Sequence, residues 1–244
     1  MINENYNKLQ SLGLMKMAEL YKFYSNDINF EQMNFDDKMS ILLDAEVENK
    51  RNNHINRLKK NSNIKYQSAN ISGIKFYPDR EIDKALTFKL ATCDYIKNHL
   101  NIICVGATGA GKTYYVSALC NAACDKEIPV KYYRLQDLLL DIDIARKNDT
   151  YKKKITKLGN IPLLIIDDFL LTPTTTQQQV DLLELLELRS EEKSTILSSQ
   201  VLPEGWHEHL GSSGLADAIL DRITSKSHYV YIKGEKSMRQ RETE

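Results

Sequence analysis

Residues 102–113, "IICVGATGAGKT", decide the fold of this chain. The second part of the stretch, residues 106–113, matches the phosphate-binding pattern G-x-x-x-x-G-K-[ST] at every constrained position. It follows four apolar residues that suit a buried strand, and it precedes a stretch with helical spacing. Backbone N–H groups of such a loop point at phosphate oxygens from a helix N-terminus. The sequence therefore predicts a nucleoside triphosphate site with Mg²⁺.

Each part of this loop has an expected task. Its glycines permit close backbone approach to the phosphates, the Lys112 ammonium neutralises the β and γ phosphates, and the Thr113 hydroxyl ligates Mg²⁺. We expect the nucleotide to contact the whole loop and the residue after it: Gly106, Ala107, Thr108, Gly109, Ala110, Gly111, Lys112, Thr113 and Tyr114.

A second stretch, "LLIIDDF" at residues 163–169, supplies the acids that such a site needs. Four apolar residues predict a buried strand, and ligands of α/β sheets bind at the carboxyl ends of strands. We expect Asp167 to hold Mg²⁺ and Asp168 to orient or activate the attacking water. The second role usually belongs to a longer glutamate, so slow hydrolysis is expected.

The strand predicted next, "TILSS" at residues 195–199, is followed by Gln200. A polar side chain at the tip of a strand beside the metal-binding strand can hold the lytic water or sense the γ-phosphate. Ser199 and Gln200 are the candidates for this catalytic role. The alternative is that small polar residues only terminate the strand.

Around these motifs, apolar runs alternate with helical patterns. Strands are expected at 102–105, 130–134, 163–166, 195–199 and 229–233, and helices at 80–98, 112–124, 135–147, 177–191 and 214–224. This alternation predicts an α/β fold with a parallel five-stranded sheet flanked by helices. Apolar residues at helical spacing before residue 60 predict a small helical domain at 1–65, followed by the sheet domain at 66–244.

Composition limits the possible classes of protein. No run approaches eighteen apolar residues and the N-terminus lacks the order of a secretory signal, so we expect a cytoplasmic protein that does not enter a membrane. The four cysteines, Cys93, Cys104, Cys120 and Cys124, show no CxxC pairing and are expected as buried free thiols. Two histidines in "EGWHEH" lack convergent partners and predict no metal site.

The net charge is zero, but the charges are unevenly distributed. Residues 50–60 hold five Lys or Arg and no acid. A second block surrounds a single aspartate and contains Arg146, Lys147, Lys152, Lys153, Lys154 and Lys157. Both blocks could be solvated helix faces. They could equally contact a phosphate backbone, so DNA binding by the second block stays open.

The order of motifs carries a resemblance. The loop at 106–113, "LLIIDD", "STILSSQ", "WHEHL", "LADAILDRI" and "GEKSMR" together resemble the IstB family of insertion-sequence helper ATPases. These are AAA+ proteins related to the helicase loader DnaC. The similarity runs from about residue 9 to residue 241. The two loop and strand motifs are general to P-loop proteins, whereas "SSQVLPEGWHEHLG" and "LADAILDRI" are much more specific.

The resemblance implies an ATP-dependent accessory protein of transposition that assembles as a homo-oligomer on DNA, which we take to be duplex. It implies help in target selection or remodelling and stimulation of a partner transposase through the helical N-terminal domain. It also implies that the helical lid of many AAA+ proteins is absent, since 22 residues follow Arg222. Arg239, in the tail, could then contact nucleotide, contact DNA or be solvated.

Arg222, in "LADAILDRI", is a charge on a short, largely apolar helix that also carries Asp217 and Asp221. Beside a nucleotide site it becomes a candidate arginine finger for the γ-phosphate of a neighbouring subunit. The alternative is an ion pair within its own chain. Two other functions remain open: a DnaC-like loader of a replicative helicase, and a small-molecule phosphotransferase, which the apparent lack of a lid disfavours.

Overall fold

The computed structural model describes residues 2–234 and 236–241. Its contacts group the chain into two compact units, one ending at Arg57 and the other beginning at Leu58. The helices of the first unit are α1 Ile2–Ser11, α2 Met15–Tyr24, α3 Ile28–Gln32 and the larger part of α4 Phe35–Ser62.

A buried acid organises the first unit. The Oε2 of Glu46, on α4, accepts hydrogen bonds from the backbone N–H groups of Lys16 and Met17 at 2.8 and 3.0 Å. These amides belong to the first turn of α2, which has no helical partner for them, so Glu46 caps α2 from another helix. The unit also exposes large apolar side chains, of which Phe23, Phe35 and Leu12 are the most accessible.

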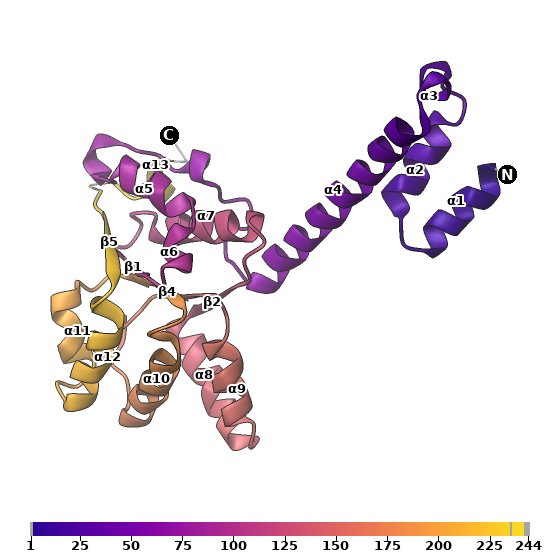
Figure 1. The fold of residues 1–244 in the computed structure, drawn as a ribbon. Coiled ribbons are helices and arrows are strands. Elements are labelled where there is room, and N and C mark those ends of the chain that lie inside the picture. The colour runs from indigo at the N-terminus through magenta and orange to yellow at the C-terminus, as the bar shows by residue number, and fades with distance from the viewer. Residues whose placement is uncertain (1, 235, 242–244) are drawn as a thin grey trace. The chain divides into compact units, whose positions relative to one another are not determined.

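The second unit contains a sheet of five parallel strands in the order β2-β3-β4-β1-β5 (Figure 1). The strands are β1 Asn101–Gly106, β2 Val130–Arg134, β3 Leu163–Asp167, β4 Ser194–Ser199 and β5 Ser227–Ile232. The predicted α/β class and five parallel strands are confirmed. Since β4 lies beside β3, the ends of "LLIID" and "STILSS" share one edge of the sheet.

Helices cover both faces of this sheet (Figure 1). Alternate strand residues point to opposite faces, so Ile102 and Cys104 pack with α7 while Ile103 and Val105 pack in the second core. The α7 side holds η1 Ile71–Gly73, η2 Pro78–Arg80, α5 Lys84–Ala91, α6 Asp94–Lys97 and α7 Lys112–Asp125. The other core is formed by α8 Leu135–Lys147, α9 Tyr151–Gly159, α10 Thr176–Arg189, α11 Pro203–His209 and α12 Gly214–Thr224.

One predicted helix differs from the structure. The pattern at 80–98 predicted a single helix, whereas α5 ends at Ala91 and α6 begins at Asp94. Cys93 lies between them with φ 62°, in the left-handed region, so no continuous helix can pass through it. All four cysteines are buried free thiols.

The tail is short within the described residues. After β5 they form only α13 Met238–Arg241. In the same part of the chain, no helix combines the length and apolar character needed to cross a bilayer.

Candidate active site

The phosphate-binding loop joins β1 to α7, as the sequence predicted. Gly109 and Gly111 adopt φ +80° and +91°, a region that favours glycine. A Cβ on Gly106 would lie 2.1 Å from the carbonyl oxygen of Ile232 on the neighbouring strand. The loop conformation therefore depends on these three glycines, and α7 begins directly at Lys112.

The Lys112 ammonium is folded back onto this loop. Its Nζ donates hydrogen bonds to the carbonyl oxygens of Gly106 and Ala107 at 2.7 and 2.9 Å. The side chain is buried, and this burial lowers the pKa of Lys112. A cation held inside a cradle of backbone groups is suited to a phosphate anion.

Asp167 is the centre of a hydrogen-bond cluster at the end of β3, with only 2% of the residue exposed. Its Oδ2 accepts from Thr113 Oγ1 and from Tyr132 Oη, each at 2.8 Å, and its Oδ1 accepts from the Asp168 backbone N–H at 2.9 Å. A carboxylate beside a hydroxyl offers the hard oxygen ligands that Mg²⁺ prefers. Thr113 and Asp167, the two predicted metal ligands, are thus in contact and fit that ion.

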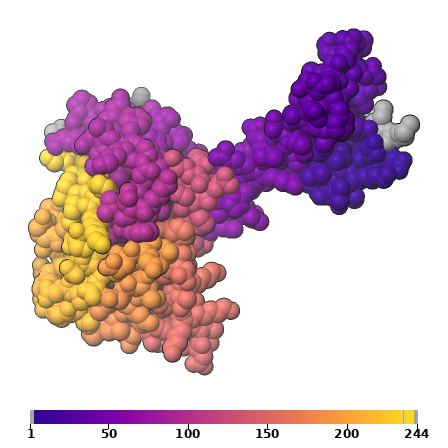
Figure 2. Space-filling model, viewed as in Figure 1, coloured from indigo at the N-terminus to yellow at the C-terminus, as the bar shows by residue number. Residues whose placement is uncertain are grey.

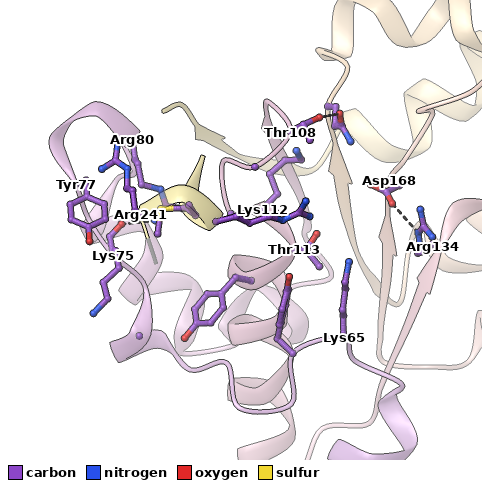
Figure 3. Close-up of a pocket in the computed structure, with 18 of the residues that line it drawn as sticks. Lys65, Lys75, Tyr77, Arg80, Thr108, Lys112, Thr113, Arg134, Asp168 and Arg241 are labelled. Carbon is purple, nitrogen blue, oxygen red and sulfur yellow. Dashed lines mark hydrogen bonds and ion pairs between the residues drawn. The ribbon is translucent and has the colours of Figure 1, made fainter. Parts of the chain in front are cut away.

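Asp168 points into the same site from the residue after β3. Its backbone is in the left-handed region, with φ 52°. Arg134 Nε, from the end of β2, donates to Asp168 Oδ2 at 2.9 Å (Figure 3). This hydrogen bond raises the pKa of Arg134. No motif or spacing in the sequence indicated a role for Arg134.

Lys112, Thr113, Asp168 and Arg134 line one cavity of about 700 Å³, within the size range of small-molecule sites, and Asp167 lies outside that lining. Eight predicted nucleotide or catalytic residues line it: Thr108, Gly109, Gly111, Lys112, Thr113, Tyr114, Asp168 and Gln200. Arg239, whose role the sequence left open, lines it too. The rest of the lining was not predicted: Lys65, Tyr66, Gly73, Lys75, Tyr77, Arg80, Arg134, Leu171, Met238 and Arg241.

Arg80 lines this cavity and is hydrogen-bonded to the phosphate-binding loop. It is 4% exposed, and its Nη1 and Nη2 donate to the carbonyl oxygens of Lys75 and Ala110 at 2.6 and 2.7 Å. The Lys233 N–H in turn donates to the Arg80 carbonyl oxygen at 3.0 Å. Burial lowers the pKa of Arg80, with Arg241 nearby adding to that effect. Arg80 and Arg241 lie on the same side of the loop (Figure 3).

Comparison with known proteins places the chain in a family. The model for IstB-like ATP binding proteins matches residues 7–244. The chain belongs to the IstB-like family. Among its relatives is y4pL of Sinorhizobium fredii, named as an insertion-sequence ATP-binding protein, which is 32% identical over 94% of this chain and 93% of its own. Another, from the insertion sequence IS1162 of Pseudomonas fluorescens, is 32% identical over 82% of this chain and 87% of its own.

Solved structures support the fold of this IstB-like chain. DnaI is similar with a TM-score of 0.59 and 18% identity, over 68% of this chain and 91% of its own. The DnaC helicase loader gives 0.54 and 19%, over 68% and 97%. DnaA bound to AMPPCP and single-stranded DNA gives 0.57 and 19%, over 70% and 51%. At such identities the likeness describes the fold alone, which is that of AAA+ P-loop proteins.

Of the two candidates at the end of β4, Ser199 and Gln200, only Gln200 lines the cavity of this IstB-like chain. Its Oε1 accepts a hydrogen bond from Thr108 (Figure 3). Ser199 is fully buried, donates to the Phe169 carbonyl oxygen at 2.7 Å and accepts from Trp206 Nε1 at 3.3 Å. Its hydroxyl is engaged in packing the strand end, so the geometry favours Gln200 over Ser199 for a role at the nucleotide.

Arg222 lies outside the lining of this cavity. It extends from α12 to form ion pairs with Glu187 of α10 and, at 3.4 Å, with Asp221. Its hydrogen bond to Glu187 lowers the pKa of that carboxyl. The side chain is partly exposed, so a second molecule could reach it. Within the described residues of its own chain, Arg222 pairs with acids and does not contact the phosphate-binding loop.

The six basic residues after Ile144 divide into two groups. Three form ion pairs: Arg146 with Asp181, Lys147 with Asp143 and Lys154 with Asp141. Lys152, Lys153 and Lys157 are exposed on α9 and have no ion pair with the described acids. The helices that carry all six, α8 and α9, form a prominent part of the surface in Figure 2. Nearby Lys154 and Lys157 add to burial in lowering the pKa of Lys131, which indicates a locally positive surface.

Proposed function

We propose that this chain is an ATP-hydrolysing accessory protein of transposition, which assembles as a homo-oligomer on duplex DNA and stimulates a partner transposase. The observation that carries the proposal is the contact of Thr113 Oγ1 with Asp167 Oδ2 at 2.8 Å beside Lys112. It joins the end of the phosphate-binding loop to the acid of the next motif. Membership of a family that includes insertion-sequence proteins supplies the biological setting.

In this proposal each residue has a defined task. The backbone of residues 106–113 binds the phosphates of ATP, with Lys112 as the cation among them. Thr113 and Asp167 would hold Mg²⁺, which when bound neutralises charge that develops on the phosphates. Asp168 orients the attacking water and accepts its proton. Gln200, at the tip of β4, positions that water or senses the γ-phosphate.

Two parts of the proposal concern assembly. Arg222 supplies positive charge to the ATP of a neighbouring subunit, because it is partly exposed and lies outside the cavity of its own chain. The exposed lysines of α9 contact DNA phosphates. The helical N-terminal domain, with its exposed Phe23 and Phe35, contacts the transposase.

The test is assembly on duplex DNA, measured by analytical ultracentrifugation with ATP, with a non-hydrolysable analogue and without nucleotide. Wild type should form large complexes only with nucleotide, and Lys112→Ala should form none. Lys97→Ala changes the same charge at an exposed site on α6 and should behave as wild type. Assembly that ignores nucleotide, or wild type that hydrolyses no ATP, would refute the proposal.

The helicase-loader alternative differs from the proposed function in the protein partner that the chain binds. Pull-down with the purified chain should retain a transposase and not a replicative helicase. Retention of the helicase alone would replace the proposed function with a loader.

A further inference from the structure

The strand β2 touches both acids of the active site. Tyr132 and Arg134 are two residues apart, so their side chains leave β2 on the same face. Tyr132 Oη donates to Asp167 Oδ2 at 2.8 Å, and Arg134 Nε donates to Asp168 Oδ2 at 2.9 Å. Each of the two acids that follow "LLII" is therefore in contact with a different side chain of β2, Asp167 with Tyr132 and Asp168 with Arg134.

We propose that Tyr132 is a positioning residue for Mg²⁺ binding: its hydroxyl holds the Asp167 carboxylate in the orientation that binds the ion. The inference rests on the proposed ATPase function and adds a residue to it. The buried position of Tyr132, 7% exposed, would suit any large core side chain. Only tyrosine fills that space and also places a donor on this carboxylate.

Strand register explains how the contact forms. Tyr132 is paired with Ile165, and Asp167 lies two residues further along β3 on the same face. A tyrosine is long enough to lean along the strands and reach a diagonal neighbour. Both groups are almost fully buried, so water cannot replace the Tyr132 hydroxyl as the partner of Asp167.

The donors on Asp167 show why Tyr132 matters when the metal binds. In the described residues, the side-chain donors on Oδ2 are Thr113 and Tyr132. A Thr113 hydroxyl that ligates Mg²⁺ would do so through an oxygen lone pair, so it would have to serve the ion and Asp167 together. Tyr132 is not among the expected ligands of the ion, so its hydroxyl is the side-chain donor whose single task is to hold the carboxylate. Losing such an outer partner lowers metal affinity about tenfold or more.

The test measures binding without turnover. Calorimetric titration with a non-hydrolysable ATP analogue, in Mg²⁺ and in EDTA, gives the factor by which Mg²⁺ tightens binding. In EDTA, Tyr132→Phe should bind the analogue as tightly as wild type does. The factor by which Mg²⁺ tightens binding should be about tenfold smaller in this variant than in wild type. Tyr133→Phe removes the same hydroxyl from the residue that faces the opposite core and should keep the wild-type factor.

Two results for Tyr132→Phe overturn the inference. An unchanged Mg²⁺ factor in Tyr132→Phe refutes the positioning role, and equal losses in Mg²⁺ and EDTA show a structural role instead. If wild type has no Mg²⁺ factor, the proposed function itself fails. Should the phenylalanine variant not fold, Tyr132→Gln, which keeps a donor, should retain a larger factor than Tyr132→Leu, and equal factors would also refute the inference.

Discussion

Arg134 Nε lies 2.9 Å from Asp168 Oδ2, so the acid expected to activate water is held by a cation from the neighbouring strand. The pair is within the cavity, and both residues line it. A carboxylate in an ion pair has a fixed direction and a stabilised charge. Asp168 is shorter than the usual glutamate, and the contact with Arg134 further restrains it, so the pair offers a structural basis for the slow hydrolysis we expect.

Replacing this acid by its amide should separate binding from chemistry. Asp168→Asn keeps the size and one acceptor oxygen for Arg134 but cannot accept a proton. We expect turnover to fall at least tenfold while nucleotide affinity changes little, since general base catalysis contributes about a hundredfold or more. Single-turnover phosphate release measures the first quantity and analogue titration the second. Asp137→Asn, an exposed acid on α8, is the matched control, and an unchanged rate in Asp168→Asn would remove this residue from the mechanism.

The pH dependence of binding should report Lys112. Burial lowers the pKa of the free ammonium below its ordinary value of 10.5, and bound phosphates favour the charged form. The complex therefore binds its proton more tightly than the free protein, so nucleotide affinity must fall as the pH rises toward 10.5. Lys112→Arg stays charged, and its weaker binding should vary less over the same range. Parallel profiles for the two proteins would contradict this assignment.

Removing the guanidinium of Arg80 should loosen the phosphate-binding loop. It donates to Ala110 within the loop and to Lys75 outside it, so Arg80→Ala leaves the buried Ala110 carbonyl without this partner, at a cost of about 1–3 kcal/mol. We expect a lower melting temperature and weaker analogue binding. Arg80→Lys keeps the charge but not the two-pronged geometry, and it should recover only part of both losses. Full recovery by lysine would show that only the charge matters.

The loop, the acids and the strands could be predicted because each depends on a short, continuous stretch of sequence. A motif fixed residues 106–113, and apolar runs marked each strand to within two residues at either end. Tyr132 shows what could not be predicted: its alternation along β2 indicates only a core residue. Its contact with Asp167 depends on β2 lying beside β3. The order of strands in a sheet is not determined by the local sequence pattern of any one strand. Arg80 is the first residue of the stretch 80–98 that the pattern predicted as one helix, and its burial follows from its contact with distant Ala110.

The exposed lysines of α9 should determine how DNA binding depends on salt. Each phosphate contact that is lost reduces the slope of log affinity against log salt by about 1, so replacing Lys152, Lys153 and Lys157 by alanine should reduce it by up to about 3. Fluorescence anisotropy with duplex DNA at several salt concentrations measures the slope. A matched variant removes three exposed lysines from the opposite side of the sheet: Lys89, Lys97 and Lys126. Equal slopes for the two variants would place the DNA surface elsewhere.

Arg222 provides the sharpest test of assembly, because its two possible roles predict different partners. As an arginine finger it acts on the ATP of a neighbour, and its loss should lower turnover on the order of a thousandfold. As a structural residue it acts through Glu187, its ion-pair partner on α10. Arg222→Ala and Glu187→Gln should then have the same effect. The finger role instead predicts that Glu187→Gln, which frees the arginine, keeps its activity.

Mixing separates these roles within one experiment. Subunits with Arg222→Ala retain a complete phosphate-binding loop, and subunits with Lys112→Ala retain the arginine, so mixed assemblies should recover part of the ATPase activity that neither variant has alone. Lys226→Ala, an exposed cation just after α12, serves as the charge control and should be active unmixed. Mixed assemblies of normal size that stay inactive would mean that Arg222 does not complete a neighbouring site. Recovery would mean that the cavity of one chain is incomplete as a catalyst until a second chain adds its arginine.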